Sequence, residues 1–150
     1  MDTDIQYHLM AAPLWTVFPG HYDQERLNGT VYEYRAFIES MGFDIVIYFE
    51  AGDYAGDVLV LVRHGFHYGI LAFSFGSCSG CDALQACSTH EELEALRQRF
   101  FESIKWGTAC ELLDYVEKRD WALNHEWYLP GCPEFVEDAK TLLRRVCAAT

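Results

Sequence analysis

The sequence FSFGSCSGCDALQAC, residues 73–87, combines cysteines and glycines in a spacing that suits a reactive site. Cys78 and Cys81 have the Cys-x-x-Cys spacing of a zinc half-site, and Cys87 could supply a third thiolate. A fourth ligand would have to come from a distant residue such as His90 or Cys110, because the sequence contains no second Cys-x-x-Cys pair. A zinc-thiolate site is therefore one candidate function of this stretch.

Three other interpretations of the same stretch remain open. A Cys-x-x-Cys motif at the start of a helix can be redox-active, because the helix dipole stabilises the thiolate, although Asp82 opposes this by like charge. Residues 76–80 also match the G-x-S-x-G nucleophile elbow with Cys78 in the serine position, and His90 or His125 could serve as its base. In the structural interpretation, the glycines permit unusual backbone angles and the cysteines pack as small apolar side chains. No catalytic residue is assigned.

Whether the even number of cysteines indicates disulfides depends on the compartment in which the protein is expected to lie. The start of the chain, MDTDIQYHLM, is acidic and lacks the basic region of a signal peptide, and no segment approaches the roughly 18 apolar residues of a membrane span. We therefore expect a cytoplasmic protein with reduced thiols, and not the three disulfides that an even number of cysteines would allow. The cysteines are Cys78, Cys81, Cys87, Cys110, Cys132 and Cys147.

The composition predicts a folded, strongly acidic domain. Of 150 residues, 51% are hydrophobic, and 23 acidic residues oppose 11 basic ones to give a net charge of −12. Such a surface repels nucleic acid and anionic membranes, but it attracts a protein whose basic groove normally binds nucleic acid. The carboxylates expected to be exposed for such a partner are Asp53, Asp57, Glu91, Glu94, Glu134, Glu137 and Asp138.

Hydrophobic periodicity predicts the elements that must position these residues. Alternating β-branched segments predict antiparallel strands, capping boxes at Thr30, Thr89 and Thr108 predict helix starts, and Pro133 suits the first turn of a last helix. The fold class is therefore α+β, a three-stranded or slightly larger antiparallel sheet packed by several helices, in a single domain over residues 1–150. The expected elements are a helix over 30–41, strands over 43–50, 57–64 and 66–75, a short helix over 82–87, and helices over 89–106, over 108–121 and from 133 onward, with 1–28 poorly patterned.

Residues 52–106, and above all the segment GSCSGCDALQ, resemble a family of small, largely uncharacterised proteins encoded by bacteriophages and some actinobacteria. The resemblance implies no established activity and assigns no catalytic residue. It implies a phage-type protein that acts on a host component. We therefore expect a protein that binds and inhibits a host defence or nucleic-acid-handling protein, by mimicking nucleic acid. The alternative is a cysteine-centred enzyme, or a zinc or redox protein, built on Cys78 and Cys81.

Overall fold

The computed structural model describes residues 5–13, 34–52, 56–76, 82–87, 89–121 and 133–150. Contacts divide the chain into two compact units, one formed by residues 1–43 and 75–103 and the other by residues 44–74 and 104–150. We call them the N-terminal unit and the sheet unit. The prediction of a single domain stays a prediction. Within the described ranges, no helix combines the length and the apolar character needed to cross a membrane.

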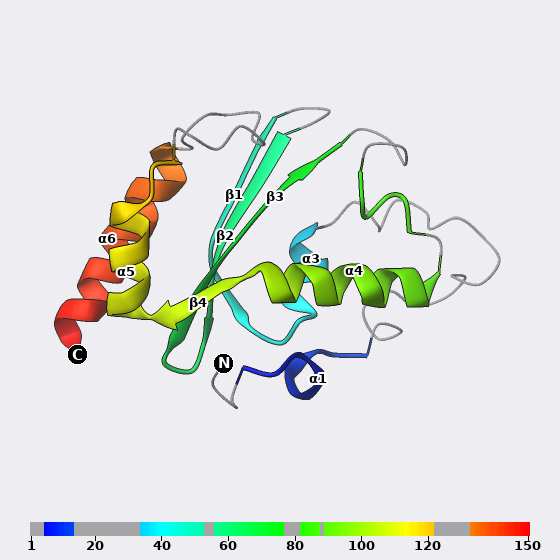
Figure 1. Ribbon diagram of the computed structural model, residues 1–150, viewed down its shortest axis with the longest axis horizontal. Coiled ribbons are helices and arrows are strands. Elements are labelled where there is room, and N and C mark those ends of the chain that lie inside the picture. Colours follow the sequence, from blue (N-terminus) through cyan, green and yellow to red (C-terminus); the bar gives the residue numbers. More distant parts are fainter. Residues whose placement is uncertain (1–4, 14–33, 53–55, 77–81, 88, 122–132) are drawn as a thin grey trace. The chain divides into compact units, whose positions relative to one another are not determined.

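The sheet unit contains a four-stranded antiparallel sheet, which confirms the predicted α+β class (Figure 1). The strands β1 (Asp44–Gly52), β2 (Gly56–His64), β3 (His67–Phe75) and β4 (Lys105–Thr108) lie in the order β1-β2-β3-β4. The first three match the predicted segments. The turn between β2 and β3 holds two residues and begins at Gly65, whose φ of 59° is one that glycine adopts readily.

The fourth strand replaces the end of a predicted helix. The helical pattern was expected to continue to residue 106, but β4 pairs instead with β3, and Trp106 lies opposite Gly69. A Cβ atom on Gly69 would lie 2.9 Å from the Trp106 ring and 2.5 Å from a methyl group of Ile104. Only glycine leaves room for this close approach, so the pairing depends on a residue 37 positions earlier in the chain.

Two helices, α5 (Ala109–Lys118) and α6 (Pro133–Ala149), lie side by side and pack on the sheet (Figure 1). Thr108 caps α5 as predicted, because its hydroxyl accepts a hydrogen bond from the Glu111 amide. Alternate residues of β2 and β3 share the covered face. The buried core consists of Leu59, Leu61, Tyr68, Ile70, Ala109, Leu112, Val116, Trp121, Phe135, Val136, Ala139 and Leu143.

The N-terminal unit contains the helices α1 (Tyr7–Met10), α3 (Tyr34–Glu39) and α4 (His90–Ser103). The predicted cap of α4 is confirmed, since the Glu92 amide donates to the Thr89 hydroxyl at 3.1 Å. The chain after α3 turns at Gly42, where φ is +94° and a Cβ atom would lie 2.1 Å from the Met10 carbonyl oxygen. Residues 82–87 form a turn, in which the Ala86 amide donates to the Asp82 carbonyl, and not the predicted short helix.

A buried arginine connects the segments of the N-terminal unit. The Arg97 side chain is 3% exposed, and its guanidinium donates to Ser40 Oγ at 3.1 Å, to the Ala12 carbonyl at 2.7 Å and to Glu94 Oε2 at 2.7 Å. Its Nε also donates to the Tyr7 hydroxyl, which in turn donates to Glu94. Burial raises the pKa of Tyr7 above its ordinary value. A buried charge is tolerated only when paired and hydrogen-bonded in this way, so the network is part of the fold.

Candidate functional site

The cysteine stretch begins at a buried carboxylate. Asp82 is 3% exposed, and its Oδ1 accepts hydrogen bonds from the Tyr34 hydroxyl at 2.6 Å and from the Leu84 and Gln85 amides at 3.0 Å each. Its Oδ2 accepts from the Gly76 amide at 2.9 Å. Four donors therefore converge on one side chain, and burial with the Asp82 contact raises the pKa of Tyr34 above its ordinary value.

These bonds join the described residues on the two sides of the predicted cysteine site. Gly76 and Asp82 lie on either side of residues 77–81, and the Gln85 side chain adds a bond to the Gly76 carbonyl at 3.1 Å. Cys78 and Cys81 lie outside the described residues, so their predicted roles stay predictions. The hydrogen bonds of Asp82 support a structural role for this residue. The sequence had indicated only that its negative charge opposes the formation of a thiolate.

Cys87, the third proposed thiolate, is a buried thiol. It is 8% exposed, and its Sγ donates to the Ala83 carbonyl at 3.4 Å. Burial is the main cause that raises its pKa to about 11, and Glu92 adds to the effect. The group is therefore protonated at neutral pH, which makes it a weak nucleophile in the absence of a metal.

We expect Cys87 to react with iodoacetamide at pH 8 about 100-fold more slowly in the folded protein than in urea, because a thiolate is the reacting species and its pKa is about two units higher when buried. Peptide mapping by mass spectrometry measures each cysteine separately. The direction of the pKa shift also predicts the effect of alkaline pH. Because the pKa of the Cys87 thiol is higher in the folded protein than in the unfolded chain, we expect the free energy of unfolding to fall as the pH rises from about 9 to about 11. Equal alkylation rates with and without urea would contradict the burial of this thiol.

Within the described residues, the other proposed metal ligands and catalytic bases do not lie together in one site. His90 is the first residue of α4 and is half-buried, whereas His125 lies outside the described ranges. In the parts of the chain that the structure describes, no three His, Cys, Asp or Glu side chains form a group that could hold a metal ion. The zinc, redox and nucleophile interpretations of Cys78 and Cys81 therefore stay predictions.

One disulfide corrects the expectation that the cysteines are all reduced. Cys110, at the start of α5, is bonded to Cys147, near the end of α6, with 5.0 Å between their Cα atoms. The two residues are 37 positions apart, and the packing of α5 against α6 brings them together. Cys110, which is bonded in this way, cannot act as a thiolate ligand.

The structure places the carboxylates proposed for a partner in different surroundings. Asp57 was expected to be exposed, but it is fully buried in β2 and accepts a hydrogen bond from the Ser74 hydroxyl at 2.9 Å. Glu94 was also expected to be exposed; its side chain is partly exposed, and it is paired with the buried Arg97. Asp53 lies outside the described residues. The exposed candidates are Glu91 on α4 and Glu134, Glu137 and Asp138 on α6.

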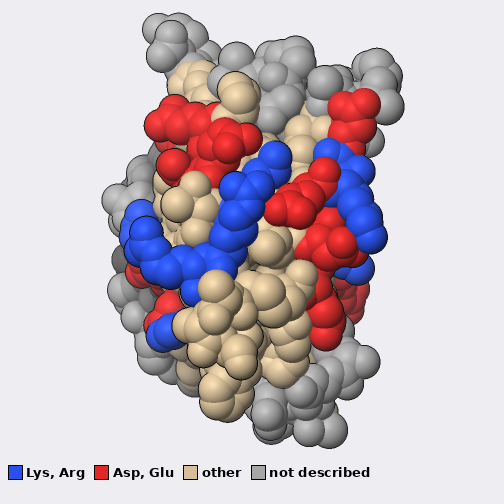
Figure 2. Space-filling view, turned by 90° about the vertical axis from the view of Figure 1, so that its left-hand side faces the viewer, with Lys and Arg blue, Asp and Glu red and all other residues tan. Residues whose placement is uncertain are grey.

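The sheet unit does not carry a uniformly acidic surface. Residues 104–150 contain six of the 11 basic residues but only eight of the 23 acidic ones. Figure 2, which views the side on which α5 and α6 lie in Figure 1, shows acidic and basic side chains intermixed, with basic groups running between acidic patches. The net charge of the chain is therefore not representative of this face.

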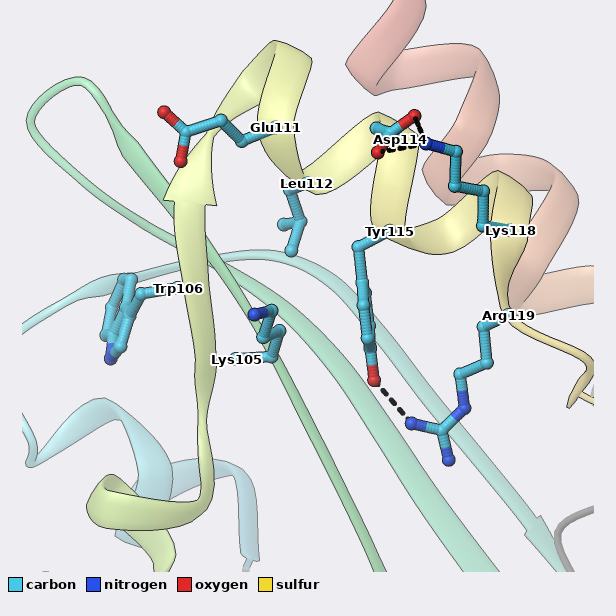
Figure 3. Close-up of a pocket in the computed structure, with 8 residues that line it drawn as sticks. All are labelled: Lys105, Trp106, Glu111, Leu112, Asp114, Tyr115, Lys118 and Arg119. Atoms are coloured by element: carbon cyan, nitrogen blue, oxygen red, sulfur yellow. Dashed lines mark hydrogen bonds and ion pairs between the residues drawn. The ribbon is translucent and has the colours of Figure 1, made fainter.

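A groove between β4 and α5 is a feature that the sequence did not suggest (Figure 3). Its volume is about 550 Å³, and we call it the β4–α5 groove. Tyr115 extends from α5 into it, and the Lys105 ammonium lies 5.4 Å from the centre of the Tyr115 ring. The lining residues are Lys105, Trp106, Glu111, Leu112, Asp114, Tyr115, Lys118 and Arg119.

The sequence contained one signal for this groove. Tyr115 and Arg119 are four residues apart on α5, and so are Asp114 and Lys118, a spacing that places each pair on one face of a helix. The contribution of Lys105 could not be foreseen, because the pattern assigned it to a helix and not to a strand beside α5.

Comparison with family models, curated proteins and solved structures found no match.

Proposed function

We propose that this chain is a binding protein and not an enzyme, and that its exposed carboxylates attach it to a basic surface of a host protein. The observation that carries the proposal is on α6. One face of this helix supplies Phe135, Val136 and Ala139 to the core, while Glu134 and Asp138 face outward and form no ion pair with any described residue. Both carboxylates are exposed, and the contribution of Glu134 to the start of α6 does not need a partner side chain, so both are available for a host protein.

The mixed charges of the sheet unit limit the proposal to defined clusters. Glu137 is paired with Lys140 at 3.5 Å, but its side chain is 68% exposed, so this pair contributes little to stability and yields easily to another cation. Glu91, in the first turn of α4, is a second outward carboxylate. A host protein that binds nucleic acid presents a matching basic groove. In this proposal the carboxylates occupy the positions that nucleic-acid phosphates take in that groove, and the binding takes place in the host cytoplasm.

The test reverses the α6 cluster in the variant Glu134→Lys/Glu137→Lys/Asp138→Lys. Wild type and variant are immobilised, and the proteins that each retains from an actinobacterial lysate are identified at low and high salt. Any candidate is then purified, and its affinity is measured directly. We expect the reversal to weaken that affinity about tenfold or more, and we expect salt to weaken wild-type binding, because the attraction is between exposed charges.

Two control variants make the outcome specific. Glu39→Lys/Glu50→Lys/Glu102→Lys changes the net charge by the same amount at other exposed positions and should bind much more tightly than the α6 variant. Cys78→Ala should bind like wild type. Thermal melts check that the fold survives, since reversal of Glu134 near a helix start costs a few tenths to about 1 kcal/mol. If Cys78→Ala abolishes binding while the α6 variant retains it, the cysteine alternative replaces this proposal.

A further inference from the structure

The Cys110–Cys147 bond lies at the surface of the sheet unit. Cys110 is exposed and Cys147 is half-buried, so a small thiol in solution has access to the bond without unfolding of the helices. The cytoplasm, where the sequence predicts that the protein lies, keeps thiols reduced. Exposed disulfides are more easily reduced than buried ones and are the labile or regulatory bonds of proteins. The surroundings of this bond are therefore those of a bond that opens in the folded protein.

Other contacts hold α5 against α6 when the bond is open. Leu112 of α5 and Leu143 of α6 are 1% and 0% exposed and belong to the same buried core. Arg144 of α6 also pairs with Glu117 of α5 at 3.1 Å. Because these contacts do not involve either sulfur, opening the bond lowers stability without removing the core between the helices. Reduction and reoxidation can both take place in a folded chain.

The two sulfurs lie at helix ends of opposite polarity. Cys110 is the second residue of α5, where the helix dipole favours a thiolate, and Cys147 lies in the last turn of α6, where the dipole opposes one. The Thr150 hydroxyl donates to the Cys147 carbonyl at 2.7 Å and lies 3.9 Å from Cys110 Sγ, close enough to turn toward a thiolate there. Glu111, the next residue, opposes that thiolate by like charge, but it is exposed to water, which weakens the effect. Of the two sulfurs, Cys110 is therefore the more accessible and the better stabilised as a thiolate.

We propose that the Cys110–Cys147 bond is a reversible thiol-exchange site, which a dithiol reductant opens in the folded protein by attack on Cys110. This inference goes beyond the proposed function, because it concerns neither the exposed carboxylates nor a host protein that binds them. The reductant is a dithiol, because a second thiol in the same molecule resolves the mixed disulfide rapidly. Cys87 takes no part, because it is a buried thiol of the N-terminal unit.

The exchange takes two steps. The thiolate of the reductant attacks Cys110 Sγ, the bond between the two Sγ atoms breaks, and Cys147 leaves as a thiolate that takes up a proton. The second thiol of the reductant then loses its proton and attacks the reductant sulfur of the mixed disulfide, which releases Cys110 as a thiolate. The reductant ends as its own intramolecular disulfide, and the protein has gained two electrons. A stabilised thiolate leaves more readily, so the position of Cys110 at the start of α5 favours the second step.

The first test measures how fast dithiothreitol reduces the bond in the full chain, with and without urea. Samples are quenched with acid, and peptide mapping by mass spectrometry follows Cys110 and Cys147 separately from the other cysteines. We expect the rate in native buffer to lie within about tenfold of the rate in urea, because the bond is already exposed in the folded protein. Oxidised glutathione should then restore the same bond in a chain whose circular dichroism stays that of a folded protein. A larger difference between the two rates, or a bond that does not form again, would overturn the proposal.

Matched single variants identify the reactive sulfur. Cys147→Ser leaves Cys110 as a free thiol and Cys110→Ser leaves Cys147, so both variants lack the same bond. We expect oxidised glutathione to form a mixed disulfide with Cys110 at least about fivefold faster than with Cys147 at neutral pH. Cys87→Ser is the control and should be reduced by dithiothreitol as fast as wild type, because this buried thiol takes no part. Equal rates at Cys110 and Cys147, or slower reduction of Cys87→Ser, would show that Cys110 is not the reactive sulfur.

Discussion

Replacement of Asp82 by alanine is expected to lower the free energy of unfolding by about 4 kcal/mol, because buried donors left without an acceptor cost roughly 1–3 kcal/mol each and relaxation recovers part of the sum. The change leaves the Tyr34 hydroxyl and the amides of Gly76, Leu84 and Gln85 without their shared acceptor. Urea denaturation monitored by circular dichroism measures the change.

The asparagine variant separates the role of the two carboxylate oxygens. Asp82→Asn retains an oxygen for the three donors at Oδ1, but it places an amide N–H₂ opposite the Gly76 amide at the Oδ2 position. We expect it to lose about 1–2 kcal/mol, less than alanine. Asp44→Ala, at an exposed carboxylate on β1, should change stability by less than about 0.5 kcal/mol. An Asp82→Ala variant as stable as Asp44→Ala would rule out a structural role for this carboxylate.

Loss of the Cys110–Cys147 disulfide is expected to lower stability by about 4 kcal/mol, the chain-entropy value for a bridge between residues 37 positions apart. The bond restricts the unfolded chain, so removing it favours unfolding even if the folded contacts between α5 and α6 are unchanged. For a chain of this length the corresponding fall in the melting temperature is about 10 °C. Thermal and urea denaturation of Cys110→Ser/Cys147→Ser measure both quantities.

Reductant provides the internal control for this prediction. Wild type in the presence of a thiol reductant should fall to the stability of the double serine variant, whereas the variant itself should not respond to reductant. A serine variant as stable as oxidised wild type would mean that the bond adds nothing to the fold. A variant that loses stability on reduction would place the sensitive thiols elsewhere in the chain.

Local sequence signals predicted most of the secondary structure. Thr89 and Thr108 cap α4 and α5 as expected. Each hydroxyl accepts a hydrogen bond from the backbone amide three residues later, and this local bond needs no distant residue. The strands were predictable for a similar reason, since alternation of β-branched residues reflects which side chains face the core. The helix predicted over 82–87 is a turn, and the helix predicted over 89–106 ends at residue 103, beyond which β3 provides a partner strand that local preference cannot anticipate.

Local sequence pattern and tertiary structure both determine which candidate carboxylates are exposed. Glu134 and Asp138 are exposed as their helical positions predicted, since the periodicity of α6 assigns them to the outer face. Asp57 is the second residue of β2 and has the sequence context of a surface residue, but it is buried and accepts a hydrogen bond from Ser74. Whether a polar side chain at an element's end is covered depends on its neighbours in space, which the pattern does not contain.

The amino-acid sequence by itself determined the α+β class, the capped helix starts and the cysteine stretch as a candidate site. Only the tertiary structure decided the four-donor role of Asp82, the burial of Arg97, the Cys110–Cys147 bond and the cationic groove beside β4. The physical reason is the range of the interactions. Capping and periodicity act over three or four residues, whereas Tyr34 and Asp82 are 48 residues apart and Cys110 and Cys147 are 37 apart, and such contacts exist only after the chain has packed.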